Sequence, residues 1–105
     1  MNKNDLRNGM MVVTNNNDHF LFTDSFFNFY GGSFLIADWG WVELYHYDEE
    51  LAFEQNKNLP LSVKEIYSAD GPYSIYEFFE GEYYSWTLLW QRPFEVEAEV
   101  GYDSK

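Results

Sequence analysis

The chain has 105 residues, the length of a single domain, and its eighteen acidic side chains against six basic ones give a formal net charge of −12. Nucleic acid and anionic membranes attract basic proteins, so this charge argues against direct binding to either. The absence of cysteine rules out a disulfide framework and a thiolate metal site. No apolar run approaches the roughly 20 residues of a membrane span, so we expect one soluble, intracellular domain.

Aromatic residues are the second unusual feature of the composition. Ten Phe, nine Tyr and four Trp occur in the chain, and each buries about 150–250 Å² when it is packed inside. A core of this size does not hold all of them. We therefore expect part of the aromatic set on the surface, where tyrosine and tryptophan are typical of protein interfaces.

A β-hairpin is predicted at residues 10–23. Residues 10–14 (MMVVT) and 19–23 (HFLFT) favour two strands. The Asn-Asn-Asn-Asp segment between them favours a turn, because these side chains tolerate left-handed geometry and bond their own backbone.

The middle of the chain predicts less regular structure. Residues 33–37 favour a third strand, and residues 41–44 are expected to be extended after a turn. In the polar stretch that follows, Asp48 is expected to cap a short helical turn. Residues 56–60 predict a loop.

Two further strands are predicted in the C-terminal half, at residues 61–67 and 83–92. Trp90 is expected in the core, with Leu88 on the same strand face because side chains alternate along a strand. The segment 73–79 (YSIYEFF) is ambiguous, since its aromatic residues recur at helical spacing while their types favour a strand.

The C-terminal residues 93–105 form an acidic strand or tail in this interpretation, because residues 95–100 alternate as a half-buried strand does. Five to seven short strands in 105 residues indicate an all-β fold, or a β fold with one short helix. We expect a small antiparallel barrel or roll.

Short motifs resemble a family of small, mostly uncharacterised proteins of bacteriophages and prophages of Gram-positive bacteria. The opening Asp5-Leu6-Arg7-Asn8-Gly9-Met10 carries the resemblance, as do Trp41 with Tyr47-Asp48-Glu49-Glu50-Leu51, then Val63-Lys64-Glu65-Ile66-Tyr67, and finally Leu89-Trp90-Gln91-Arg92. The resemblance covers about residues 5–92. It implies a phage origin, an SH3-like small barrel and no enzymatic activity, and it brings no catalytic residue to this chain.

Four groups of residues are candidates for a partner-binding surface. They are Asp48, Glu49 and Glu50; Phe27, Phe29 and Tyr30; Tyr73, Tyr76 and Phe79; and Glu95, Glu97 and Glu99. Core packing is the alternative for both aromatic groups, although four aromatics at 26–30 cannot all face inward from one strand. The three tail carboxylates would stand about 6.7 Å apart on one strand face, a spacing that imitates a row of phosphates. A plain solvated face is the alternative.

Catalytic and metal sites are not indicated. His46 lies near the acids 48–50, but no second histidine stands at a ligand spacing, and the acids do not follow a calcium-loop pattern. No serine lies in a nucleophile context, and Gly31-Gly32 lacks the lysine of a phosphate loop. We expect no enzyme, no cofactor and no metal.

The function predicted from the sequence is that of a phage accessory protein that binds a host protein with a basic surface in the host cytoplasm. A sharper hypothesis is inhibition of a host defence nuclease, such as a CRISPR nuclease, by an acidic surface that mimics DNA and is supplemented by aromatic anchors. The alternative is a small-molecule sponge for a nucleotide immune signal. A virion or assembly component is a third class, for which the sequence offers nothing distinctive.

Overall fold

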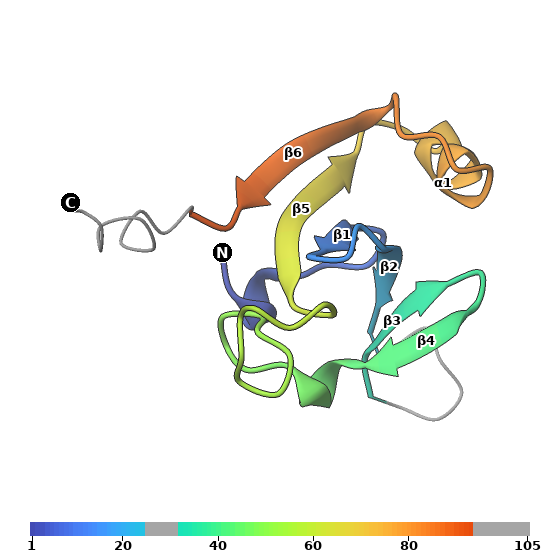
Figure 1. The fold of residues 1–105 in the computed structure, drawn as a ribbon. Coiled ribbons are helices and arrows are strands. Elements are labelled where there is room, and N and C mark those ends of the chain that lie inside the picture. Colours follow the sequence, from blue (N-terminus) through green and yellow to red (C-terminus); the bar gives the residue numbers. More distant parts are fainter. Residues whose placement is uncertain (25–31, 94–105) are drawn as a thin grey trace.

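In the part of the chain that the structure describes, six strands form one antiparallel sheet, and one short helix packs against it (Figure 1). The computed structural model describes residues 1–24 and 32–93. The elements are η1 (Lys3–Asp5), β1 (Met11–Thr14), β2 (His19–Thr23), β3 (Phe34–Ala37), β4 (Gly40–Glu43), η3 (Leu44–His46), β5 (Val63–Ala69), α1 (Tyr73–Phe79) and β6 (Trp86–Gln91). The strand order is β4-β3-β2-β1-β5-β6, so the sheet is open and β4 and β6 are its edges. The predicted fold class, a mostly β antiparallel roll with one short helix, is confirmed.

The predicted N-terminal hairpin is confirmed as β1 and β2, with Met11 opposite Leu21 and Val13 opposite His19. Its turn contains Asn17 in the left-handed region at φ 65°, a conformation that asparagine tolerates better than most residues. The Thr14 hydroxyl closes the turn by accepting a hydrogen bond from the Asp18 N–H at 3.1 Å. The local chemistry of the turn residues therefore fixes the hairpin register.

The core has two parts because both faces of the sheet are covered. On one face, Val12 and its partners Phe20 and Ile66 pack with side chains from the long loop between β4 and β5. On the other face, Met11 and Leu21 pack with Phe78 of α1 and Trp86 of β6. Figure 1 shows α1 and the long loop on opposite sides of β1. All four residues of the central strand β1 are buried as a result.

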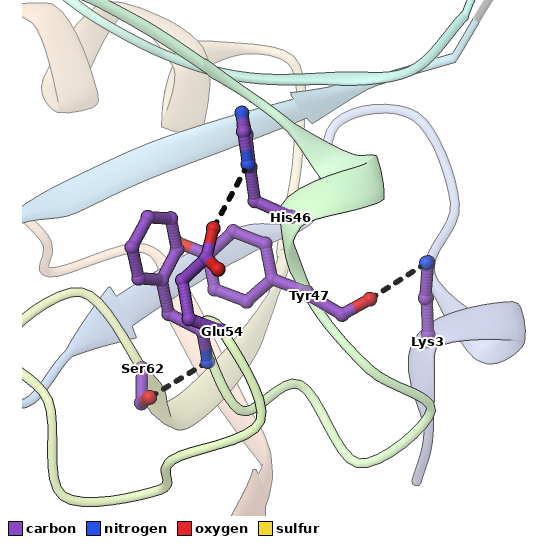
Figure 2. Close-up of polar contacts among 6 residues, drawn as sticks. Lys3, His46, Tyr47, Glu54 and Ser62 are labelled. Carbon is purple, nitrogen blue, oxygen red and sulfur yellow. Dashed lines mark hydrogen bonds and ion pairs between the residues drawn. The ribbon is translucent and has the colours of Figure 1, made fainter.

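The long loop is held over its face of the sheet by buried hydrogen bonds (Figure 2). The Tyr47 side chain is almost completely buried, and its hydroxyl donates to the Leu61 carbonyl at 2.8 Å. The Ser62 hydroxyl accepts from the Phe53 N–H at 2.8 Å, and the Lys3 ammonium donates to the Tyr47 carbonyl at 2.7 Å. These bonds satisfy polar groups that the loop would otherwise bury unpaired.

The helical turn predicted after Asp48 is wrong. The short 3₁₀ helix η3 lies before it, and residues 49–50 form a turn that leads into Leu51 with φ at 64°. The Asp48 carboxylate does bond backbone N–H groups as a cap would, accepting from Glu50 at 2.9 Å and from Ala52 at 3.0 Å. The buried side chain of Leu51 holds the chain in this left-handed conformation, which a helix cannot contain.

The ambiguous segment 73–79 is the helix α1. Pro72 occupies the N-cap position with helical dihedral angles, which the proline ring favours. Ser74 is completely buried, and its hydroxyl accepts hydrogen bonds from the N–H groups of Asp70 and Gly71 at 3.1 and 3.2 Å. Phe78 packs into the second part of the core. These contacts favour a helix over the strand that the residue types prefer, so tertiary context overrides propensity here.

Strand β6 contains a bulge that changes which side chains share a face. Trp90, predicted as a core residue, pairs with Ile66 and packs against the first part of the core, but it is only partly buried. The register then shifts by one residue, and Leu88 pairs with Tyr67. Leu88 therefore shares its face with Trp86, not with Trp90, and it is 46% exposed. The prediction that Leu88 and Trp90 share a face is wrong, because the extra residue Leu89 in the bulge reverses the alternation of side chains between them.

Candidate partner-binding surface

Helix α1 presents a row of aromatic side chains to solvent. Tyr73, Tyr76 and Phe79, all three among the predicted partner-binding residues, are 55%, 77% and 57% exposed. They stand three residues apart, which places them along one side of a helix, and Ser74 and Phe78 occupy the buried side. We call Tyr73, Tyr76 and Phe79 the α1 ridge.

The α1 ridge is held rigidly by polar contacts to the segment that follows the helix. The Glu77 carboxylate accepts hydrogen bonds from the Ser85 N–H at 2.8 Å and from the Ser85 hydroxyl at 2.9 Å. The Ser74 hydroxyl donates to the Ser85 carbonyl at 2.6 Å. A helix of seven residues is too short to be stable alone, so these bonds and the burial of Phe78 determine where the ridge points.

A pocket of about 200 Å³ opens where the end of α1 meets two sheet turns. Its walls come from the β1–β2 turn, the β3–β4 turn and the segment after α1. The lining residues are Asn17, Asp18, His19, Ala37, Asp38, Trp39, Phe78, Phe79, Gly81 and Tyr83. The pocket therefore combines aromatic rings with two carboxylates, and Phe79 belongs both to it and to the α1 ridge.

Two of the residues that line this pocket, His19 and Tyr83, have stacked rings. The His19 and Tyr83 rings lie parallel within 5°, with centroids 4.1 Å apart. Burial lowers the pKa of His19, which favours the uncharged imidazole. Burial first and the Asp38 carboxylate second raise the pKa of Tyr83, which keeps its phenol protonated. At neutral pH the charges that line the pocket are those of Asp18 and Asp38.

The acidic group Asp48, Glu49 and Glu50 lies on the long loop and has structural contacts of its own. The Asp48 carboxylate closes a turn, as described above, and a Glu49 oxygen accepts from the Asn4 amide at 3.0 Å. The Arg92 guanidinium donates to the Glu50 carbonyl at 2.8 Å and to the Val63 carbonyl at 3.0 Å. Glu49 and Glu50 are exposed, so their charges face solvent.

A second hollow beside this loop contains Tyr45, His46 and Glu54. The Nδ1 atom of His46 lies 3.2 Å from a Glu54 carboxylate oxygen (Figure 2), and the exposed Tyr45 ring is 4.2 Å from the His46 ring between centroids. Within residues 1–24 and 32–93, no three His, Asp or Glu side chains are grouped as metal ligands. His46 pairs with Glu54 and not with the acids 48–50.

Half of the predicted site residues fall in the two segments that the structure does not describe. Phe27, Phe29, Tyr30, Glu95, Glu97 and Glu99 lie outside the described residues. The structure therefore brings together only Tyr73, Tyr76 and Phe79, on one helix, while Asp48, Glu49 and Glu50 lie on the loop that covers the opposite face of the sheet.

Sequence reasoning missed several surface residues that the fold reveals. Trp39 and Trp41, in the β3–β4 hairpin, are 61% and 66% exposed, and Tyr84 is 85% exposed. For Trp39 the signal was the tight turn Asp38-Trp39, because a turn at a sheet end has no layer above it to bury an indole. Trp41 lies on the edge strand β4. The meeting of His19 with Tyr83 had no local signal, since 64 positions separate them in the chain.

The helices of the described part are all too short or too polar to cross a lipid bilayer. No protein-family model, no curated protein and no solved structure matches this chain. The resemblance to phage proteins stays a prediction.

Proposed function

We propose that this chain is a binding protein without catalytic activity that docks on a basic surface of another protein. The observation that carries the proposal is the α1 ridge, a row of exposed aromatic side chains on a helix whose position is fixed by buried contacts. Tyrosine and phenylalanine fixed in this way offer a large contact area at a small entropic cost, which is the property of binding hot spots.

The net charge defines the kind of partner. With a charge of −12, the chain attracts a positively charged surface at long range and accelerates the encounter. Asp18 and Asp38 lie in the pocket that Phe79 shares with the ridge, so carboxylates and aromatics meet at one place. We extend the proposal to a phage accessory protein that blocks a basic nucleic-acid channel of a host defence nuclease, in accord with the resemblance and the charge.

The competing hypothesis of a nucleotide sponge has weaker support. A nucleotide phosphate requires basic side chains, and neither hollow is lined by lysine or arginine. Both are lined by carboxylates, which repel phosphate. The pocket next to α1, at about 200 Å³, is also smaller than the roughly 300–1,000 Å³ of typical small-molecule sites.

The experiment is affinity capture from lysate of a Gram-positive host with three proteins in parallel. The first is the wild-type chain and the second is Tyr73→Ser/Tyr76→Ser. The third is a control, Tyr45→Ser, which removes an aromatic of comparable exposure, 71%, from η3 beside the long loop. We expect a host protein with a basic surface that is retained by the wild type and the control, lost by the ridge variant, and eluted by salt.

Direct binding kinetics with the purified partner then test the two parts of the proposal separately. Higher salt should slow association, because it screens steering, while the ridge variant should accelerate dissociation. Equal capture by the wild type and the ridge variant, or a salt-independent association rate, would contradict the proposed surface.

A further inference from the structure

The pocket beside α1 has a chemical character that the proposed function does not use. Its lining offers the rings of His19, Trp39, Phe79 and Tyr83 together with the carboxylates of two aspartates. Aromatic faces attract cations through their quadrupole, and carboxylates attract them through charge. Both components of the pocket therefore select a positively charged ligand.

We infer that this pocket receives one arginine side chain of the partner protein. The inference rests on the proposed function for the source of the arginine, but the pocket can be tested without the partner. A guanidinium is planar, stacks on aromatic rings and donates to carboxylates in a fork. The compact ammonium of lysine does neither as well.

The size of the pocket agrees with a single side chain. Its volume of about 200 Å³ slightly exceeds the roughly 150 Å³ of a cavity that holds benzene. A guanidinium with part of its aliphatic stem fits such a space, whereas a nucleotide does not. Ring contacts support the walls: Trp39 packs edge-on against the buried Phe20 at 5.5 Å between ring centroids, and Tyr83 stacks on His19.

The charges around the pocket favour the cation. Asp18 and Asp38 line it, and Glu65 and Lys64 act on His19 from β5. The Lys64 ammonium donates to the Asn17 side chain at the rim. The positive charge of Lys64 is therefore outnumbered by the negative charges of Asp18, Asp38 and Glu65. His19 adds no opposing charge at neutral pH, because its buried ring is uncharged there.

The test is a titration of the full chain with three blocked tripeptides, followed by NMR at neutral pH. The peptides are Gly-Arg-Gly, Gly-Lys-Gly and Gly-citrulline-Gly, and citrulline has the shape of arginine without its charge. The signals are the Trp39 indole N–H and the His19 ring protons. We expect saturable shifts with a dissociation constant of about 1–10 mM for the arginine peptide, since one side chain contributes few contacts. The lysine peptide should bind several-fold more weakly and the citrulline peptide about ten-fold more weakly.

Two variants locate the binding. Asp38→Asn should weaken the arginine peptide about two- to five-fold, as expected of one partly exposed ion pair, and Trp39→Ala should weaken it further. Both residues are exposed at a turn, so the fold should be retained. The matched control Glu49→Gln removes the same charge from the distant loop while keeping the oxygen that accepts from Asn4, and it should leave binding unchanged.

Several outcomes would overturn the inference. They are equal binding of the arginine and citrulline peptides, equal binding of the arginine and lysine peptides, no saturable shift up to about 50 mM, and an equal effect of Asp38→Asn and Glu49→Gln. The variant Tyr73→Ser/Tyr76→Ser separates the two proposals, because neither residue lines the pocket. If that variant loses the partner while no peptide binds, only the arginine pocket is wrong. If the peptides bind while that variant retains the partner, the proposed docking surface is wrong.

Discussion

The buried hydroxyl of Ser74 is the contact through which α1 is joined to the rest of the fold. It accepts from the N–H groups of Asp70 and Gly71 and donates to the Ser85 carbonyl, at 3.1, 3.2 and 2.6 Å. In Ser74→Ala the Asp70 N–H keeps a second bond to the Ser85 carbonyl at 3.0 Å. The Gly71 N–H therefore becomes the group that loses its partner.

The expected loss of stability in Ser74→Ala follows from the hydrogen bonds that the substitution removes. All three bonds of the Ser74 hydroxyl are lost, but the Asp70 N–H and the Ser85 carbonyl still bond each other, so the Gly71 N–H is the group left unpaired. Leaving one such donor without a partner costs about 1–3 kcal/mol. We therefore expect Ser74→Ala to lower the free energy of unfolding by about 1–3 kcal/mol. That is a large fraction of the roughly 5–15 kcal/mol that stabilises a domain.

Urea denaturation followed by tryptophan fluorescence measures this change, since Trp86 packs beside Phe78 of α1. Ser68→Ala is the matched control, because Ser68 is half-buried on β5 and its hydroxyl has no hydrogen bond within the described residues. A Ser74→Ala variant within about 0.5 kcal/mol of the wild type would refute the reasoning. So would an equal loss in the control.

Three further changes have expected outcomes. Tyr47→Phe removes the bond to the Leu61 carbonyl and should cost about 1–2 kcal/mol in urea denaturation, because a buried acceptor is left unpaired. Trp90→Ala should cost about 3 kcal/mol by the same measurement, since the indole is partly buried opposite Ile66. His19, whose pKa is lowered by burial, stabilises the fold above its ordinary pKa near 6.5 and loses this contribution as the pH falls through the lowered value. Between about pH 7.5 and 5.5, His19→Phe should therefore lose less stability than the wild type.

Each of these expectations has its own contrary result. Unchanged stability of Tyr47→Phe would mean that water pairs with the Leu61 carbonyl. A Trp90→Ala variant within about 0.5 kcal/mol of the wild type would place the indole on the surface. A parallel loss of stability in wild type and His19→Phe on acidification would show that other groups determine the pH dependence; an NMR titration of the His19 ring protons checks the direction of its pKa shift directly.

The sequence by itself determined what local chemistry encodes. The turn at residues 15–18 needs only its own side chains to reverse the chain, so the hairpin of β1 and β2 was predictable. The strands β3 and β5 followed from residue type. The excess of aromatics predicted that some of them would lie outside the core, and the exposed rings of Trp41 and Tyr76 confirm it. The basic partner that the acidic charge indicates stays a prediction.

Tertiary structure decided the rest, because those features depend on residues far apart in the chain. Segment 73–79 is a helix because the Ser74 hydroxyl donates to the Ser85 carbonyl and Phe78 packs into the core. Both partners lie outside the seven residues of the segment, so its own sequence does not reveal them. The bulge in β6 places Leu88 and Trp90 on opposite faces of the sheet, because pairing with β5 sets the register and overrides simple alternation. The pocket exists because two sheet turns and the end of α1 meet at one point, bringing His19 onto Tyr83 across 64 positions of sequence. A site assembled from three separate segments has no local pattern, and only the packing of the sheet could reveal it.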